Sequence, residues 1–315
     1  MPSPLPRTQR AIALAVGLAA MFGWAIAAPA GDGPARDPRL ILDVARAGPR
    51  LVAVGEWGAV RLSADAGKTW ADVTSSTEET LTAVQFVDAL HGIAVGHHGT
   101  VIATANGGLT WAGRSPDTKS KEPLLGVFFK TPQQGFVVGS FGTLLESQDG
   151  AGSFQPRDIG QGDRHLKAIT GTPAGGVYIA SEEGVLFCSG DHGRTFRISA
   201  TGYRGSFWGV ATVEGAVLAY GMRGTIYRSD DGCGSWNAVP SGTTAGLSAA
   251  AVPAPGRVVL AGADGAVLES SDGGRSFRVV PRSDRAGITA AVAVDAHEVL
   301  LFGRGGPSSY KVVKR

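Results

Sequence analysis

Short apolar runs separated by glycine, aspartate or proline recur along almost the whole chain. Within one stretch they fall at residues 81–87, 92–95, 100–103 and 110–112. Apolar segments of this length, bounded by turn residues, are typical of β-strands. The pattern therefore predicts units of four short strands, and it is unlike that of a helical or disordered protein.

This unit repeats. Each copy contains Gly-x-x-Gly, an apolar strand, and then a motif of the form Ser-x-Asp-x-Gly-x-Thr-Trp, which the first copy shows at residues 55–58 and 63–70. The Ser or Thr that opens the second motif stands at positions 63, 104, 147, 189, 229 and 270, which gives intervals of 41, 43, 42, 40 and 41 residues. In the third and fifth copies we take Gly152 and Gly234 as the glycine of the motif, and in the fourth we take Ala180 as the first residue of a longer Gly-x-x-Gly turn.

An apolar residue also opens each repeat, 14 or 15 residues before the first glycine position. These residues are Leu40, Leu81, Leu124, Leu166, Phe207, Leu247 and Ile288. Four-stranded units of this period are propeller blades, which must stack around an axis because one blade cannot bury both its faces. We therefore predict an all-β fold, a seven-bladed β-propeller with Asp-box turns over residues 40–315.

The acidic residue of the motif has a mechanical explanation. An Asp or Asn side chain can accept hydrogen bonds from the backbone of its own turn, and glycine supplies the positive φ that such a turn needs. A calcium site is disfavoured because each turn offers one carboxylate, whereas Ca²⁺ takes six to eight oxygens. We assign a structural role to the six box residues, which are Asp65, Asn106, Asp149, Asp191, Asp231 and Asp272.

The two ends of the chain carry further predictions. Arg7 and Arg10 precede an uncharged, largely apolar stretch at 11–28 that ends in small residues, which predicts a signal peptide over 1–30 and a periplasmic or exported protein. An uncleaved membrane anchor is the alternative. Residues 31–39 form a short segment whose Pro34 and Pro38 make a poor strand, so we expect at most three strands in the seventh blade.

The charge balance and the two cysteines allow predictions about partners and about a disulfide. The chain has 29 basic and 27 acidic residues, and removing the signal leaves 27 of each, so we expect no nucleic-acid partner. Cys188 and Cys233 are the only cysteines. Because the repeat puts them on different blades, a Cα separation below about 7 Å looks hard to reach, and we expect two free thiols rather than a disulfide.

The turns resemble the Asp-box (BNR) repeats of sialidases, sortilin-type receptors and several glycosidases. Seven even repeats with Gly-x-x-Gly before the box, after a signal peptide, are more similar to the photosystem II stability/assembly factor family. That resemblance implies an exported, non-enzymatic factor that binds a membrane-protein complex or another periplasmic protein. We expect the protein to be a monomer. A transport or envelope complex is an equal alternative to a photosystem as its partner.

Other classes of function find less support in the residues. A sialidase-type glycosidase, the alternative from a different class, needs an arginine triad, a tyrosine with a neighbouring glutamate, and usually two carboxyls about 5–10 Å apart, none of which the sequence reveals. A carbohydrate or small-ligand receptor that uses the central channel is the third possibility. His97-His98 lacks further ligands nearby for a metal, so we expect no metal and no cofactor.

Propeller geometry puts the Gly-x-x-Gly turns and the connections between repeats on one face. Tryptophan, phenylalanine, methionine and arginine gather there, and these types are enriched at protein interfaces. We predict a protein-docking surface made by Trp57, His97, His98, Phe141, Tyr203, Arg204, Met222, Arg223 and Arg304.

Overall fold

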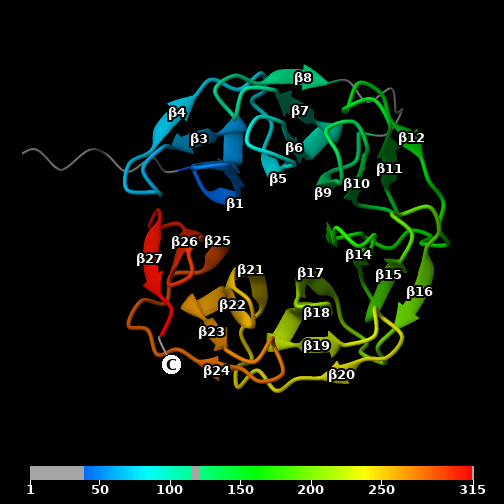
Figure 1. The fold of residues 1–315 in the computed structure, drawn as a ribbon, viewed down its shortest axis with the longest axis vertical. Coiled ribbons are helices and arrows are strands. Elements are labelled where there is room, and N and C mark those ends of the chain that lie inside the picture. Colours follow the sequence, from blue (N-terminus) through cyan, green and yellow to red (C-terminus); the bar gives the residue numbers. More distant parts are fainter. Residues whose placement is uncertain (1–38, 115–120, 314–315) are drawn as a thin grey trace, which may run out of the picture. The chain divides into compact units, whose positions relative to one another are not determined.

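Seven antiparallel sheets, which we call blades 1 to 7 in chain order, are arranged around a central axis (Figure 1). The structure, a computed structural model, describes residues 39–114 and 121–313, all within the unit Asp37–Arg315. Each blade is a simple meander whose first strand lies nearest the axis. This confirms the predicted seven-bladed propeller.

The bounds of the strands follow the repeat. Blade 1 contains β1 (Ile41–Ala47), β2 (Arg50–Gly55), β3 (Val60–Ser63) and β4 (Ala71–Val73), and blade 2 contains β5 (Leu81–Phe86), β6 (Gly92–Gly96), β7 (Val101–Thr104) and β8 (Ala112–Arg114). Blade 3 contains β9 (Leu124–Phe129), β10 (Gly135–Gly139), β11 (Leu144–Ser147) and β12 (Gln155–Pro156), and blade 4 contains β13 (Ala168–Gly171), β14 (Val177–Ala180), β15 (Val185–Ser189) and β16 (Arg197–Ala200). Blade 5 contains β17 (Phe207–Val213), β18 (Ala216–Gly221), β19 (Ile226–Ser229) and β20 (Asn237–Ala238), and blade 6 contains β21 (Leu247–Ala254), β22 (Arg257–Gly262), β23 (Val267–Ser270) and β24 (Arg278–Val279). Blade 7 contains β25 (Ile288–Asp295), β26 (Glu298–Gly303) and β27 (Ser308–Lys311).

The meander divides the loops between two faces. The Gly-x-x-Gly turns contact the connections between blades, as where Gly58 N donates to Glu79 O at 3.0 Å, and together they form what we call the turn face. The Asp boxes contact the hairpins between first and second strands, as where Gly107 N donates to Leu90 O at 2.9 Å, and they form the box face. The two kinds of turn therefore lie on opposite sides of the ring, as the repeat predicts.

Strand pairing corrects two details of the predicted repeat alignment. Ile41 pairs with Gly55 as Leu81 pairs with Gly96, so Ile41 and not Leu40 opens the first repeat in register with the others. In blade 4 the turn begins at Ser181, whose N–H donates to Val185 O at 3.2 Å. This turn has the usual length and does not begin at Ala180. The sequence pattern alone could not decide between these neighbours, because Leu40 and Ile41 are both apolar and Ala180 and Ser181 are both small.

The Asp boxes are held by a recurring set of hydrogen bonds. In blade 1 the Ser63 hydroxyl donates to Asp65 Oδ1 at 2.8 Å and accepts from Gly67 N at 2.8 Å. Thr69 donates to the same carboxylate through its backbone N–H at 2.9 Å and its hydroxyl at 2.6 Å. The side-chain hydroxyl and backbone of Thr69 lower the pKa of Asp65 to about 2, because both stabilise the charged form.

Asparagine makes the same turn in blade 2. Asn106 Oδ1 accepts from Thr104 Oγ1 at 2.9 Å and from Thr110 N at 3.0 Å, while its amide donates to Thr110 Oγ1 at 2.8 Å. The turn therefore needs an acceptor at this position and does not need a charge. This agrees with the structural role predicted for the motif.

Two consecutive backbone positions in every described box have positive φ, and in blades 1, 2, 4 and 6 the second of them is the glycine of the motif. In blades 3 and 5 this second position is occupied by Ala151 (φ 65°) and Cys233 (φ 74°). The predicted choice of Gly152 and Gly234 is thus wrong by one residue. In both repeats a glycine follows directly after the true position, and the sequence alignment matched that glycine instead.

The hydrophobic core is divided among the contacts between neighbouring blades. Trp70 of the first box packs edge to face on Phe302 of blade 7, with ring centroids 5.5 Å apart, and Phe196 of blade 4 does the same with Phe136 of blade 3 at 6.0 Å. Trp70 and Phe196 are half-buried, so each contributes less than the roughly 1.5–3 kcal/mol of a fully buried aromatic. The boxes therefore join blades together as well as shaping their own turns.

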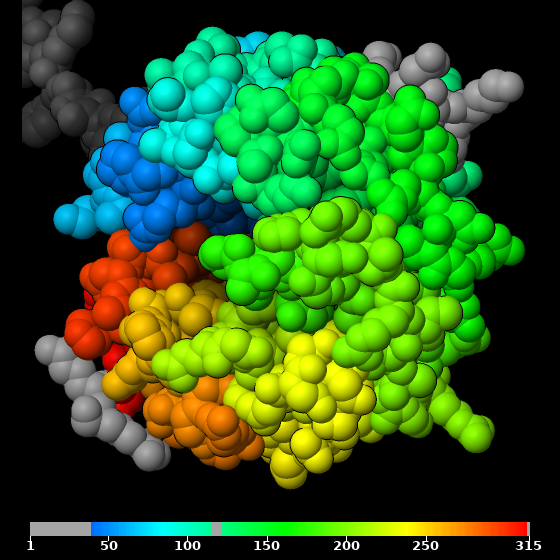
Figure 2. All heavy atoms as spheres, turned by 45° about the vertical axis from the view of Figure 1, so that its right-hand side comes forward, coloured from blue at the N-terminus to red at the C-terminus, as the bar shows by residue number. Residues whose placement is uncertain are grey.

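Blade 7 closes the ring with three strands, as expected for the described residues. Figure 2 shows the blue side chains of blade 1 directly beside the red ones of blade 7. Thr289 Oγ1 donates to Ile41 O at 2.5 Å, and Arg46 Nη2 donates to Ala293 O and Val294 O at 2.7 and 2.5 Å. Side-chain hydrogen bonds and apolar packing make this closure.

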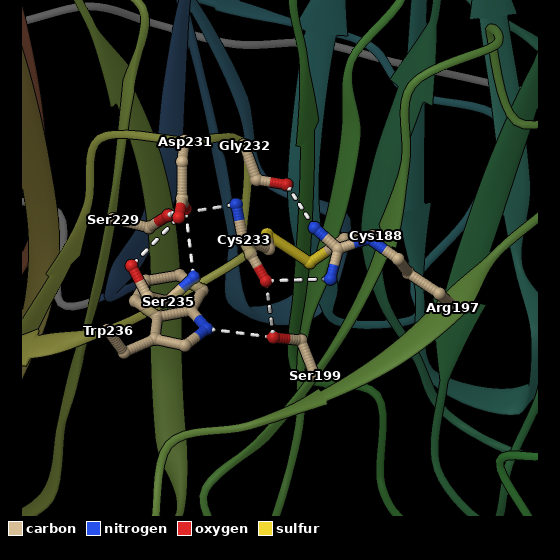
Figure 3. Close-up of a disulfide and its surroundings, with 9 residues drawn as sticks. All are labelled: Cys188, Arg197, Ser199, Ser229, Asp231, Gly232, Cys233, Ser235 and Trp236. Atoms are coloured by element: carbon tan, nitrogen blue, oxygen red, sulfur yellow. Dashed lines mark hydrogen bonds between the residues drawn. A yellow bond between two sulfur atoms is a disulfide. The ribbon is translucent and has the colours of Figure 1, made fainter.

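A disulfide joins Cys188 and Cys233, with a Cα separation of 6.5 Å (Figure 3). The prediction of two free thiols is therefore wrong. Blades 4 and 5 are neighbours, and the box position of Cys233 points at the preceding blade, where Cys188 lies on β15. Arg197 and Ser199 of blade 4 also donate to Cys233 O, both at 2.7 Å. Blade 4 therefore holds this box through hydrogen bonds as well as through the disulfide.

The predicted signal peptide at 1–30 and all but the last residue of the segment 31–39 lie outside the described residues. Within 39–114 and 121–313, no helix is long and apolar enough to cross a membrane.

Candidate functional site: the turn face and the central channel

The third residue of the Gly-x-x-Gly turn is exposed in each of blades 1 to 6. The third residue of each turn has a positive φ, a conformation that non-glycine residues adopt at some cost. These residues are Trp57, His98, Phe141, Glu183, Arg223 and Asp264. Each of them is followed by a glycine that is also left-handed, so the same backbone shape recurs with a different side chain on each blade.

Two of the presented side chains are large and apolar. Trp57 is 76% exposed and Phe141 is 61% exposed. Phe141 is supported from behind by His165, whose ring centroid lies 4.8 Å away and whose Nδ1 accepts from Phe141 N at 3.1 Å. The contact holds an apolar ring in an exposed position.

The two histidines predicted for this face are both exposed. His98 Nδ1 lies 2.7 Å from Glu79 Oε2 of the connection that leads into the same blade. Among the described residues, no group of three or more His, Cys, Asp or Glu side chains is arranged to hold a metal ion.

The predicted residues of blade 5 come together. Tyr203 is half-buried, packs on Phe207 with ring centroids 5.5 Å apart, and donates its hydroxyl to Met222 O at 3.4 Å. Tyr203 thus ties the blade connection to the turn, and the residues beside it that face solvent are Arg204 and Arg223.

Arg304 is exposed in a turn of different shape. In blade 7 only Gly306 of the turn is left-handed, and its N–H donates to Gly303 O at 2.9 Å. The nine predicted residues therefore all lie on the turn face, but they are spread over five blades. Only the blade 5 group forms a local cluster.

The second candidate site is the axial cavity, which has a volume of about 470 Å³ and is lined by the innermost strands of all seven blades. Its chemistry comes from residues that the sequence did not single out, namely Asp43, Lys167, Trp208 and Tyr220. A polar or aromatic residue near the start of a first strand is the signal that could have found three of them. Tyr220 lies on a second strand, and no sequence signal places it in the channel.

Asp43 is held in the channel wall by two backbone groups. Its carboxylate accepts from Val44 N and, across the blade boundary, from Val84 N, both at 2.8 Å. Burial raises the pKa of Asp43 to about 6, although these two hydrogen bonds act in the opposite direction. No cationic side chain pairs with it among the ion pairs of the described residues.

Hydroxyl groups join the innermost strands of neighbouring blades. Thr82 Oγ1 donates to Leu124 O at 2.6 Å, and Ser248 Oγ donates to Ile288 O at 2.7 Å. Thr289 makes the equivalent bond from blade 7 to blade 1. These side chains have a structural role in the channel wall, and their oxygens retain acceptor capacity.

Seven meandering blades with six Asp boxes, an exposed turn face and a narrow axial cavity define a seven-bladed Asp-box β-propeller. The family model described as photosynthesis system II assembly factor YCF48 matches residues 61–124 and 117–259, more than half of the chain. The chain belongs to this family, as the resemblance in the sequence predicted.

Solved structures show the same fold. A structure titled YCF48 bound to D1 peptide has a TM-score of 0.73 and 18% identity, with 88% of this chain and 94% of that chain covered. YCF48 from Cyanidioschyzon merolae has a TM-score of 0.71 and 15% identity, covering 88% and 97%. A GH74 enzyme from Niastella koreensis has a TM-score of 0.70 and 12% identity, covering 86% of this chain but 52% of the enzyme. No curated protein matches the chain in sequence.

Proposed function

We propose that this protein is an exported, non-catalytic assembly or scaffold factor that holds a segment of a membrane-protein complex on its turn face. The family match carries the proposal, because it covers more than half of the chain and names an assembly factor. A relative of the same fold is described as bound to a peptide, which supports a peptide segment as the form of the partner.

The turn face supplies the contacts that such a partner needs. Trp57 and Phe141 are large, exposed and held in place by their turns, and aromatic anchors of this kind dominate binding energy at protein interfaces. Arg204 and Arg223 add charged groups that can bind carboxylates in a bidentate manner. We assign docking to this face and a structural role to the box face.

The channel supports a non-catalytic role. Asp43 is the one carboxylate among the residues that line the axial cavity, and no arginine lines it. Most glycosidases act through two carboxyl groups that flank the bond to be cleaved. A panel of fluorogenic sialosides and glycosides should therefore show no turnover, and release of the fluorophore above the blank would contradict this part of the proposal.

The disulfide supports export. Cys188 and Cys233 are both buried and joined, and structural disulfides persist mainly in oxidising compartments such as the bacterial periplasm. The apolar stretch at 11–28 after two arginines is consistent with that route. Cell fractionation with an antibody against the protein tests the localisation.

Crosslinked capture from membranes of the source organism tests the partner. The wild-type protein should enrich subunits of one membrane complex, and the Trp57→Ala/Phe141→Ala double variant should lose most of this capture. Leu90→Ala removes a side chain of similar exposure, 51%, from the hairpins of the box face and serves as the matched control. Equal capture by the double variant and the control would show that the partner does not dock through these aromatics.

A further inference from the structure

The axial cavity contains an arrangement that the proposed docking role does not use. Tyr220 on β18 is only 5% exposed, yet it lines the channel inside the innermost strand β17. It reaches the channel over Gly209 of β17, where an added Cβ would lie 2.2 Å from the Tyr220 ring and 2.3 Å from its hydroxyl oxygen. The missing side chain of Gly209 leaves the space through which this phenol enters the cavity.

The Tyr220 hydroxyl has no hydrogen-bond partner in the part of the chain that the structure describes. The hydroxyl oxygen is not one of the fully enclosed polar atoms without a partner, so it is open to the cavity that Tyr220 lines. It can therefore pair with a ligand or water there. The equivalent strand position in blades 1, 3, 6 and 7 is apolar, and those are Val54, Val138, Ala261 and Phe302. The phenol is thus a feature of this blade and not of the repeat.

Asp43 faces the same cavity from blade 1. Blades 1 and 5 are not neighbours, and Figure 1 places β1 and β17 on opposite sides of the centre of the ring. Both side chains line the one cavity, and after burial the charge of Asp43 is the second cause that raises the pKa of Tyr220.

Lys167 completes the set. It lines the cavity at the start of the first strand of blade 4, with its Nζ 3.8 Å from Glu182 Oε1. Asp43, Lys167 and Tyr220 are the titratable groups of the cavity wall. One acceptor-only carboxylate therefore lies on one side, and two donors, an ammonium and a phenol, lie on blades 4 and 5 opposite.

We propose that the central channel binds a small zwitterion of the amino-acid type, with its ammonium group at Asp43 and its carboxylate at the Tyr220 hydroxyl and the Lys167 ammonium. The charges of the wall match such a ligand at both ends. A plain amine would leave the Tyr220 hydroxyl unpaired and the Lys167 ammonium with only its contact to Glu182, and a plain carboxylate would face Asp43. The cavity of about 470 Å³ is large enough, because one water occupies only about 30 Å³ in the liquid. This proposal does not rest on the docking function of the turn face.

Calorimetric titration of the purified protein at pH 7.5 with each of the twenty standard amino acids tests the proposal. Butylamine, butyrate and glucose serve as probes that carry only an ammonium, only a carboxylate, or only hydroxyl groups. At least one amino acid should bind, and above Kd it should raise Tm with the logarithm of its concentration. Absence of binding by every amino acid, or equal binding of butylamine, butyrate or glucose, would overturn the proposal.

Variants then assign the contacts. Asp43→Asn should weaken binding by about tenfold or more, and Tyr220→Phe, which keeps the ring over Gly209, should weaken it by about threefold to tenfold. Asp264→Asn changes an exposed carboxylate on the turn face and should bind like the wild type. Circular dichroism and the unfolding midpoint establish that each variant is folded. If folded Asp43→Asn and Tyr220→Phe both bind with wild-type affinity, the ligand is not held in the channel as proposed.

Discussion

The acceptor oxygen at the centre of each box is the smallest unit on which this fold depends. In blade 4, Asp191 accepts from Ser189 Oγ at 2.7 Å and from Thr195 N and Oγ1 at 2.9 and 2.7 Å. These bonds, led by the backbone N–H of Thr195, lower the pKa of Asp191. The blade 2 box shows that an amide oxygen satisfies the same donors.

Substitutions of Asp191 can therefore separate the effect of the acceptor oxygen on stability from the effect of the negative charge. Asp191→Ala removes the carboxylate acceptor of the box and should lower Tm by a few degrees. Asp191→Asn should have a Tm close to that of the wild type, because Asn106 already occupies the equivalent position. Thermal unfolding followed by circular dichroism measures both. A loss in the Asn variant as large as in the Ala variant would mean that the charge itself stabilises the turn.

The contribution of Asp43 to folding stability depends on pH in the opposite sense to that of the box carboxylates. Its pKa is raised from 3.8 to about 6, so its protonated form is favoured by folding. The stability it contributes is fully present below pH 4 and is lost as the pH rises through 6. The box carboxylates have lowered pKa values, so they contribute above pH 4 and lose that contribution as the pH falls toward 2.

The difference in Tm between Asp43→Asn and the wild type should therefore increase between pH 4 and pH 7, in favour of the variant. Burial raises the pKa of Tyr220, which lines the same cavity, so this phenol stays protonated throughout this range. Parallel melting curves at half-unit steps of pH measure the difference. A difference that stays constant over this range would exclude a buried, ionising Asp43.

At the scale of elements, the disulfide replaces the usual packing of a box against the preceding blade. In the boxes that have glycine at this position, the glycine leaves room for a neighbour, as at Gly274, where an added Cβ would lie 2.7 Å from a Leu218 methyl group. In blade 5 a cysteine occupies this position and bonds to the neighbour instead. The left-handed φ of Cys233 is thus tolerated where a covalent bond crosses the blade boundary.

The Cys188→Ala/Cys233→Gly variant should lower the free energy of unfolding by about 2–4 kcal/mol, because the disulfide closes a loop with a sequence separation of 45 residues. Glycine adopts the left-handed φ of position 233 without strain, so the loss in free energy of unfolding should lie toward the lower end of that range. Urea unfolding of the wild type with and without a reductant gives the comparison. Equal midpoints for the oxidised and reduced protein would show that the bond adds nothing to stability.

At the scale of the whole molecule, stability depends on the contact between the first and last blades. Ile41, Val44 and Leu51 of blade 1 form one buried cluster with Leu300 and Phe302 of blade 7. A ring keeps its innermost edges protected only while all seven contacts are made. Blade 7 has only three strands and shares no strand with blade 1, so its contact with blade 1 depends on side-chain packing and side-chain hydrogen bonds.

Phe302→Ala should cost about 3–5 kcal/mol and should open the ring at this contact first. Hydrogen exchange should then increase most in β1 and in β25 to β27, with blades 3 and 4 least affected. Phe187→Ala, a change of an equally buried ring in blade 4, is the matched control. An increase spread evenly around the ring would show that the closure is no weaker than the other contacts.

Much of this architecture follows from the sequence. The period of the Ser and Asp positions, the three strands of the last blade and the inward aromatics of the boxes were all predicted correctly, because each depends on residues close together in the chain. The errors at Ser181 and Ala151 are shifts of one residue, where neighbouring small residues give the same pattern. The predicted docking residues do lie on one face, but the sequence could not tell that Tyr203 is half-buried.

The sequence by itself determined the number of blades, the chemistry of their turns and the family, since these are local patterns repeated along the chain. Only the tertiary structure decided that Cys188 meets Cys233, that blade 7 closes on blade 1, and that Asp43, Lys167 and Tyr220 share one cavity. These contacts join residues from different repeats, and their distances depend on how the blades pack around the axis. No local pattern contains that information.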